Sequence, residues 1–275
     1  MKHEIQTLDE YKKSQKREKY LILFLQIAFF AFFLGQWELT ARLGLVNSFL
    51  VSYPSQIFSL FVEYVKTNEI WRHISISLIE TLLGLVGGTL AGILIAIVLW
   101  WFPRLSKISD PFLVVLNALP KTALAPIIIL WIGTGIKGIV FVAISLSIVV
   151  TILSAHNAFL HVNPEQMKML QTFGANKWQL LWKLVLPSNI KNILNIIKIN
   201  IGMSWVGVIV GEFLVSREGI GYLVVYGGQV FKLDLVMMGV FLLAILAMLM
   251  YAIMILLEKW VDHFMHRKRK RRKSE

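Results

Sequence analysis

The sequence predicts an all-α polytopic membrane protein with six transmembrane helices. Of its 275 residues, 57% are hydrophobic, and the mean hydropathy is +0.68; both values exceed those of water-soluble domains. The apolar residues form runs of about 20, the length that an α-helix needs to cross about 30 Å of hydrocarbon. Charged residues are concentrated between these runs and at the two ends. A bundle of membrane-spanning helices is therefore expected.

The net charge of +12 does not indicate nucleic-acid binding here. The basic residues lie in tails and short loops beside apolar runs, where they orient the chain and contact anionic membrane lipid. The absence of cysteine excludes disulfides and thiol chemistry. We expect no removable signal peptide, because the first 19 residues are charged and lack a cleavage site after a short apolar core.

The six spans are expected in the order of the apolar runs. They cover residues 20–39, 75–101, 111–132, 138–160, 189–213 and 236–257, within a transmembrane domain of residues 20–258. Basic cytoplasmic tails, residues 1–19 and 259–275, flank this domain. Between the first two spans, Pro54 opens an amphipathic segment too short to cross the membrane, which we place in the outer interface.

The second span is rich in glycine. Gly84, Gly88 and Gly92 recur every four residues, which places them on one face of a helix. Small residues on one face allow a neighbouring helix to approach closely. We therefore expect tight packing here, and we interpret Glu80, near the outer end, as an interfacial residue.

Proline interrupts the third span, which follows a short inward loop at residues 102–110. Pro120 and Pro126 each free a carbonyl group one turn earlier, and a membrane tolerates this only beside protein or water. Lys121 lies next to the break. It is either part of a solute pathway or a lysine whose side chain reaches the inner surface.

Polar residues in the third to fifth spans are candidates for a translocation pathway. The candidates are Pro120, Lys121, Ser147, Thr151, Lys198, Ser204 and Glu212. Hydroxyl groups such as those of Ser147 and Thr151 more often join helices than bind a solute. We expect no metal site, because His156 and His161 have no acidic partner in the sequence.

A polar amphipathic interval, residues 163–187, separates the fourth span from the fifth. Its pattern predicts helix, turn and helix, with Gly174 in the middle and Pro187 ending the second helix before the fifth span. The two apolar stripes consist of Met167, Leu170 and Phe173, and of Trp178, Leu181, Trp182 and Val185. Such a unit lies against a membrane or a partner; a helical loop without a partner is the alternative.

The distribution of basic residues predicts the orientation of the chain. With both ends inside, the inward segments hold 20 of the 28 lysines and arginines and the outward segments hold six. Segments rich in these residues remain in the cytoplasm. The interval 163–187 is therefore expected on the side where ATP is available.

Several motifs resemble those of one protein family. Around the interval they are Phe173-Gly174-Ala175, Trp178 and Val185-Leu186-Pro187; upstream, residues 119–126 (LPKTALAP) and 130–133 (LWIG); downstream, residues 210–212 (VGE) and 218–222 (EGIGY). Together, from about Val46 to the last span, the chain resembles the inner-membrane permeases of ABC transporters, in the branch for nitrate, sulfonate and taurine. One departure is that the usual Glu-Ala-Ala of the loop falls on residues 168–170 (KML), with the nearest acid at Glu165.

The resemblance implies a type I permease fold whose interval 163–187 is a coupling-helix loop. The sequence has no G-x-x-x-x-G-K-[ST] motif, so ATP would be hydrolysed by a separate cytoplasmic ATPase subunit. The residues expected to contact that subunit are Glu165, Lys168, Phe173, Gly174, Ala175, Trp178, Leu186 and Pro187. This chain would be no enzyme itself and would carry no catalytic residue and no cofactor.

The resemblance also implies further partners. An extracytoplasmic solute-binding protein would deliver the solute, a nitrate-, sulfonate- or taurine-like anion, although similar permeases carry neutral vitamin precursors. Because an ATPase dimer offers two equivalent clefts, a homodimeric permease is the simplest arrangement. The complex would lie in the plasma membrane of a bacterium.

A secondary transporter or channel that works without an ATPase is the main alternative. No inverted repeat is visible in the sequence, which disfavours it. A membrane-embedded enzyme is a second alternative. It is disfavoured because no hydrolytic motif is present and ionisable residues within the spans are few.

Overall fold

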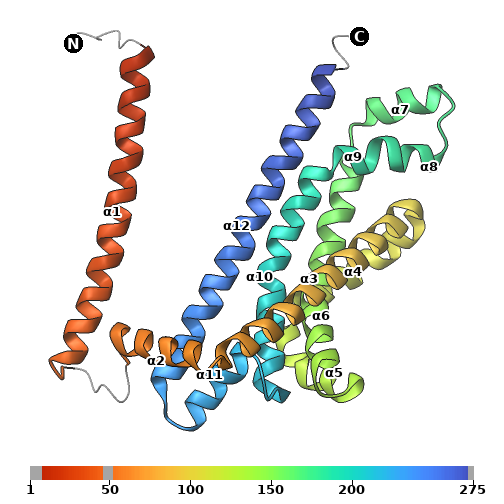
Figure 1. The fold of residues 1–275 in the computed structure, drawn as a ribbon. Helices are drawn as coiled ribbons and strands as arrows, with labels where there is room; N and C mark the ends of the chain where they lie inside the picture. Colours follow the sequence, from red (N-terminus) through yellow and green to blue (C-terminus); the bar gives the residue numbers. More distant parts are fainter. Residues whose placement is uncertain (1–7, 46–51, 272–275) are drawn as a thin grey trace.

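The computed structural model describes residues 8–45 and 52–271. The regular secondary structure of these residues is helical, which confirms the all-α prediction (Figure 1). The helices are α1 (Leu8–Arg42), α2 (Pro54–Lys66), α3 (Glu69–Trp101), α4 (Pro103–Ala118), η1 (Lys121–Leu124), α5 (Ala125–Ile132), α6 (Ile136–Leu160), α7 (Pro164–Thr172), α8 (Lys177–Leu180), η2 (Leu181–Val185), α9 (Leu186–Ser188), α10 (Ile190–Val215), α11 (Ile220–Gln229) and α12 (Leu233–Arg271).

Among the described residues, five helices are long and apolar enough to cross a membrane. These are α1, α3, α6, α10 and α12. The pair formed by α4 and η1–α5 provides a sixth crossing if it is taken as one broken span. Six is therefore the number of crossings when the broken pair counts as one.

Helices α3, α6 and α10 form the tightly packed centre of the bundle. A Cβ atom at Gly84 of α3 would lie 2.5 Å from the Cβ of Ala143 on α6, and one at Gly92 would lie 2.5 Å from Cβ of Thr151. Gly207 of α10 also lies against Ala143, so close that a side chain at position 207 would not fit. The expected close approach at the glycine face of α3 is thus confirmed, and α6 is the helix that fills it.

The third span is broken more sharply than proline positions alone predict. Its two halves meet at 85°, with Leu119 extended and Pro120 between them. Pro126 does not interrupt a helix, because it lies in the first turn of α5, where its missing donor costs nothing. The predicted inward loop at residues 102–110 is wrong: Pro103 starts α4 directly after Phe102, so this segment is helical.

Short helices gather at one end of the bundle, which we call the α11 end. There α2, α11 and the N-terminal part of α12 enclose an apolar cluster that includes Ile57, Ile70, Ile220 and Leu235. Helix α1 stands apart from the bundle along most of its length (Figure 1) and meets it near its own C-terminal end, where Trp37 stacks on Phe241. The segment opened by Pro54 is a helix, as predicted.

The opposite end, which we call the α7–α8 end, carries α7, α8, the start of α1 and the C-terminal end of α12 (Figure 1). The predicted tails are helical where the structure describes them: α1 begins at Leu8, within residues 1–19, and α12 continues to Arg271, within residues 259–275. Residues 1–7 and 272–275 lie outside the described part. The tails are therefore largely extensions of the first and last helices.

Pro187 does not end a helix before the fifth span, contrary to the prediction. It lies at the start of α9, directly after the π-helical turn η2, and α10 follows after Asn189. Proline removes a donor and crowds the carbonyl one turn earlier, and the wider π turn accommodates both effects. The interval 163–187 is thereby joined almost continuously to the fifth span.

Candidate functional site

The interval between α6 and α10 folds as two short helices joined by a tight turn. Asn163 caps α7, since its Oδ1 accepts from the backbone of Glu165 at 2.8 Å. Asn176 and Gln179 form a reciprocal capping box at the start of α8, with both hydrogen bonds at 2.9 Å. Between them Gly174 has φ +78°, a conformation that costs other residues about 1–2 kcal/mol. The sequence thus specifies both helix starts and the turn.

One side of this unit presents large apolar side chains to its surroundings. Phe173 is 82% exposed and Trp178 is 58% exposed, and Glu165, Lys168 and Gly174 are exposed beside them. A Cβ at Gly174 would meet no atom within 4 Å, so the space in front of the turn is open. We call the turn at Gly174 and the exposed residues beside it (Glu165, Lys168, Phe173 and Trp178) the knob. Because this turn lies outside the membrane-spanning helices, its exposed aromatic side chains are suited to contact with a partner or with the membrane surface.

The other side of the unit is anchored in the bundle. Leu181 and Val185 are buried in a cluster with Phe159 and Ile196, and Leu186 packs against it. The predicted second stripe is therefore divided, because Trp178 and Trp182 face outward while Leu181 and Val185 face the core. Movement of the knob would be passed to α6 and α10 through these contacts.

A contact between the knob and α3 was not predicted from the sequence. Lys177 donates from Nζ to the carbonyl oxygen of Trp101, at 3.2 Å, and its Nζ lies 5.8 Å from the centroid of the Trp101 ring. The rings of Trp101 and Trp178 meet edge to face at 5.4 Å. The adjacent tryptophans that end the second span, Trp100 and Trp101, were the signal in the sequence.

Several predicted pathway residues lie within the helix packing. Asn200 of α10 donates to Thr89 of α3 at 2.8 Å and to Thr151 of α6 at 2.7 Å. Ser147 and Ser204 are fully buried, and Ser147 bonds to carbonyl oxygens of its own helix. In this conformation Ser147 and Thr151 contribute to contact between helices, the more common role of such hydroxyl groups.

The two predicted lysines differ in their surroundings. Lys198 of α10 forms an ion pair with Glu258 of α12 at 2.5 Å, with both side chains largely covered. Lys121 lies beside the Pro120 break, and its Nζ donates to the carbonyl oxygen of Asn117 at 3.1 Å. Lys121 therefore provides a donor for a carbonyl group at the end of α4, whereas Lys198 connects α10 to α12.

A polar groove lies between α6 and α10, near the α7–α8 end. It has a volume of about 340 Å³ and is lined by Ser154, Asn157, His161, Asn192 and Asn195, together with apolar residues. Amide and hydroxyl side chains in such numbers can replace the hydration of a polar solute. None of these lining residues is among the predicted pathway residues, because the packing of α6 against α10 that brings them together is not visible in the sequence.

Glu212, at the other end of the bundle, holds the start of α11. Its Oε1 accepts from Oγ of Ser77 at 2.5 Å, and its Oε2 accepts from the backbone N–H of Gly221 at 2.5 Å. Ser77 Oγ in turn accepts from the backbone N–H of Ile220, at 2.8 Å. A carboxylate at a helix N-terminus is stabilised by the free N–H groups there. This contact explains the glycine at position 221 of the EGIGY motif, because a Cβ there would lie 2.7 Å from Oε2 of Glu212.

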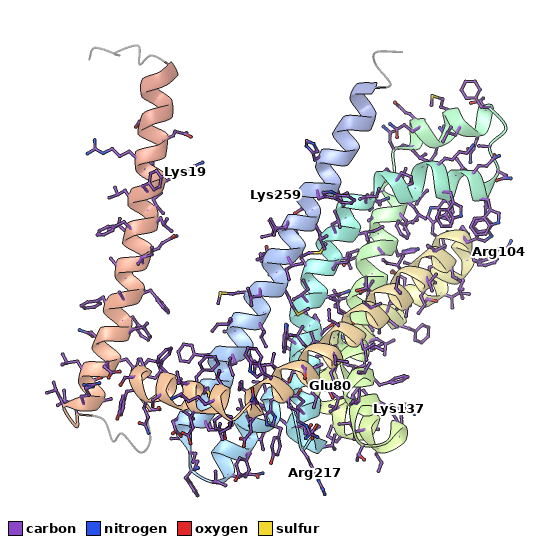
Figure 2. All side chains as sticks on the ribbon, viewed as in Figure 1. Lys19, Glu80, Arg104, Lys137, Arg217 and Lys259 are labelled. Atoms are coloured by element: carbon purple, nitrogen blue, oxygen red, sulfur yellow. The ribbon has the colours of Figure 1, made fainter. Side chains whose placement is uncertain are left out.

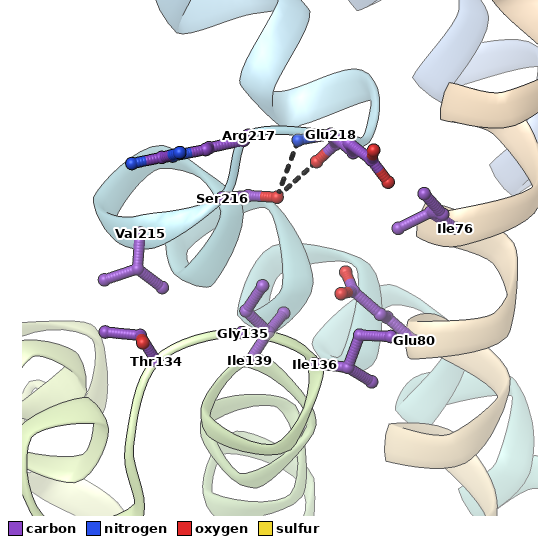
Figure 3. Close-up of a pocket in the computed structure, with 10 residues that line it drawn as sticks. All are labelled: Ile76, Glu80, Thr134, Gly135, Ile136, Ile139, Val215, Ser216, Arg217 and Glu218. Atoms are coloured by element: carbon purple, nitrogen blue, oxygen red, sulfur yellow. Dashed lines mark hydrogen bonds between the residues drawn. The ribbon is translucent and has the colours of Figure 1, made fainter.

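The interpretation of Glu80 as an interfacial residue is wrong, because its side chain is only 1% exposed. Its carboxyl group lies beside that of Glu212. It also lines a cavity of about 530 Å³ between α3, the start of α6 and the loop before α11 (Figure 3). The two acids lie far apart in the sequence, on α3 and α10, and no sequence pattern indicates that they meet.

Comparison with known proteins agrees with the sequence motifs. Residues 88–267 match the family described as "Binding-protein-dependent transport system inner membrane component". The chain is 25% identical over 234 residues to the taurine transport system permease protein TauC of Escherichia coli, covering 82% of this chain and 84% of the relative. It is 27% identical over 224 residues to the putative aliphatic sulfonates transport permease protein SsuC of Bacillus subtilis, covering 81% of each.

A third relative and a solved structure complete the comparison. The chain is 29% identical over 194 residues to the formylaminopyrimidine transport permease protein ThiX of Halalkalibacterium halodurans, covering 70% of this chain and 77% of the relative. A chain of the MetNI methionine ABC transporter, in an inward-facing conformation, matches with a TM-score of 0.59 and 15% identity, over 73% of this chain and 97% of that one. At this identity the structural match shows the fold alone.

Proposed function

Because the chain belongs to the family of binding-protein-dependent transport system inner membrane components, we propose that it works with a separate ATPase that binds at the knob. The observation that carries this proposal is the two-sided structure of the interval 163–187. Exposed Phe173 and Trp178 offer a contact surface, while buried Leu181 and Val185 fix that surface to the spans. Because the knob is packed against these spans, its displacement would move them with it.

The charge distribution supports a cytoplasmic position for the knob. Lys19 and Lys259 lie toward the α7–α8 end, and Lys137 and Arg217 toward the α11 end (Figure 2). The segments predicted to face inward hold 20 basic residues, and the segments predicted to face outward hold six. Basic segments stay in the cytoplasm, which puts both termini and the knob on the side of the ATPase and the α11 end outside.

The residues proposed to contact the ATPase are those of the knob and its base. Phe173, Gly174, Ala175 and Trp178 form the turn and the aromatic surface. Glu165 and Lys168 provide exposed charges on α7, while Leu186 and Pro187 connect the unit to α10. ATP-driven closure of the ATPase would push the knob, and α6, α10 and α3 would follow through their contacts with it.

A binding protein would dock at the α11 end, and two copies of the permease would enclose the passage. Relatives named for taurine and aliphatic sulfonates support a small sulfonate- or taurine-like solute. The polar groove between α6 and α10 would offer the solute a route toward the cytoplasm. Lys121, a basic residue at the Pro120 break, would attract an anionic solute. Two symmetric permease copies would match the two clefts of an ATPase dimer.

Co-purification with the cognate ATPase tests the proposal. In the Gly174→Trp variant the indole would fill the open space in front of the turn, so we expect loss of ATPase binding and of ATP-dependent uptake. Gly44→Trp is a matched control, because Gly44 also has a positive φ and a Cβ there also meets no atom within 4 Å, but it lies at the end of α1. Normal association and uptake in the Gly174→Trp variant would reject ATPase docking at the knob.

A further inference from the structure

The groove between α6 and α10 presents polar side chains that the packed bundle does not use. Its polar lining residues are Ser154, Asn157, His161, Asn192 and Asn195. Four of them are exposed and Ser154 is half-buried. Among the described residues, the side chains of Ser154, Asn157 and Asn195 have no hydrogen-bond partner, and Asn192 uses one N–H, which it donates to a neighbouring asparagine. These groups are therefore accessible and available to a ligand.

The groove combines donors and acceptors, and its lining contains no Asp, Glu, Lys or Arg. Each free asparagine amide offers two N–H donors and one carbonyl acceptor, and the Ser154 hydroxyl offers both functions. Nδ1 of His161 lies 2.7 Å from the carbonyl oxygen of Asn157 and therefore carries a hydrogen. A solute with a net charge would lack a counter-charge among these amides, which makes its transfer from water costly. A solute that carries both charges itself avoids this cost.

The groove also has a structural link to the knob. Ile196 forms part of its wall and belongs to the buried cluster in which Leu181 and Val185 anchor the knob. Movement of the knob would therefore change the shape of the groove. Its volume of about 340 Å³ falls in the range of sites for small molecules. A site that responds to the knob is suited to a transported solute.

We propose that the groove binds a small zwitterionic solute of the 2-aminoethanesulfonate type. The sulfonate oxygens would accept from the amide N–H groups of Asn157 and Asn195 and from the hydroxyl of Ser154. The ammonium group would donate to the amide oxygens. An alkanesulfonate without the amine would bind more weakly, because its charge would be uncompensated. The role of the groove in transport rests on the proposed function, in which the α7–α8 end faces the cytoplasm.

Thermal unfolding of the purified full-length chain tests this with three matched probes. A ligand that binds the folded state raises the unfolding midpoint. The probes are 2-aminoethanesulfonate, sodium ethanesulfonate and ethylammonium chloride, each at about 50 mM against sodium chloride. Nanodiscs of phosphatidylglycerol are used, since their headgroups are not zwitterionic. We expect 2-aminoethanesulfonate to raise the midpoint by about 3 °C and each of the other two probes by less than about 1 °C.

Substitutions in the groove should change this pattern. Asn157→Leu and Asn195→Leu, which keep the side-chain size, should each abolish the shift. Gln229→Leu, an exposed amide on α11, should keep it. Asn195→Asp adds a negative charge to the groove, so ethylammonium should then raise the midpoint while ethanesulfonate should not. This reversal tests the site even if the leucine variants do not fold.

Several results would overturn the proposal. They are the absence of a shift with 2-aminoethanesulfonate, an equal shift with ethanesulfonate, and a shift that persists in both leucine variants. If phosphatidylethanolamine in the nanodisc raises the midpoint and removes the effect of the solute, the groove holds a lipid headgroup instead. Failure of ATPase docking at the knob would leave these measurements unaffected, because no ATPase is present.

Discussion

Lys177 lies over the indole ring of Trp101, with Nζ 5.8 Å from the ring centroid, and donates to the Trp101 carbonyl oxygen at 3.2 Å. These residues are far apart in the chain, and they connect the start of α8 to the last residue of α3. The carbonyl belongs to the final turn of α3, where helices leave acceptors without partners. The contact gives the knob a connection to α3 besides its connections to α6 and α10.

The Trp101→Ala variant should weaken coupling while leaving ATPase binding intact. The substitution removes the edge-to-face contact with Trp178 and the cation–π contact with Lys177, each worth about 0.5–1.5 kcal/mol. We expect several-fold less solute uptake per ATP hydrolysed in proteoliposomes. Phe102→Ala is the control, because Phe102 is exposed and adjacent. An unchanged ratio of uptake to hydrolysis would show that α3 receives no force through Trp101.

The Gly88→Ala variant should destabilise the bundle. A Cβ at Gly88 would collide with Oγ of Ser147 on α6, and overpacking of this kind typically costs about 1–3 kcal/mol. The second substitution Ser147→Ala removes the colliding atom and should restore much of the loss. Thermal unfolding in nanodiscs measures both effects. A double variant no more stable than Gly88→Ala would contradict the packing described here.

The Glu212→Ala variant should loosen the start of α11. It leaves Ser77 and the backbone N–H of Gly221 without their acceptor, and loss of hydrogen bonds to a buried charge costs about 3 kcal/mol. Hydrogen exchange should accelerate across residues 220–229 and stay unchanged in α6. Glu63→Ala, on the exposed side of α2, should leave exchange in α11 as it is. Equal protection of α11 in both variants would exclude this role for Glu212.

The ion pair between Lys198 and Glu258 should tolerate exchange of its partners. Replacing Lys198 with alanine leaves a largely covered carboxylate alone, which is typically more costly than losing an exposed pair. The unfolding midpoint of Lys198→Ala should therefore fall, and the double variant Lys198→Glu with Glu258→Lys should recover most of it. If the double variant is no more stable than Lys198→Ala, the pair does not join α10 to α12.

Local patterns predicted much of the fold, and contacts between distant residues escaped prediction. The spacing of Gly84, Gly88 and Gly92 indicated a close helix contact, but only the three-dimensional structure identifies α6 as the partner. Pro120 marked a break, whereas its 85° angle depends on how both halves pack. Glu80 was misinterpreted because its neighbour Glu212 comes from the end of a later span, which the sequence does not place beside it.

The knob illustrates the same distinction. Gly174 and the Asn176 capping box are local features, so helix, turn and helix followed from the sequence. The division of the second stripe into exposed Trp178 and buried Leu181 depends on the neighbouring spans. The prediction that Pro187 ends the helix was also wrong. The π turn before it accommodates the proline, and the chain continues into α10.

The position of the knob can be measured with a single cysteine, since the chain has none of its own. The Phe173→Cys variant would be exposed to a membrane-impermeant maleimide, in intact cells and in inverted membrane vesicles. We expect labelling in inverted vesicles only, and protection from labelling when the ATPase subunit is bound. Labelling of Cys at position 173 from outside intact cells, or equal labelling with and without the ATPase, would contradict the proposed coupling.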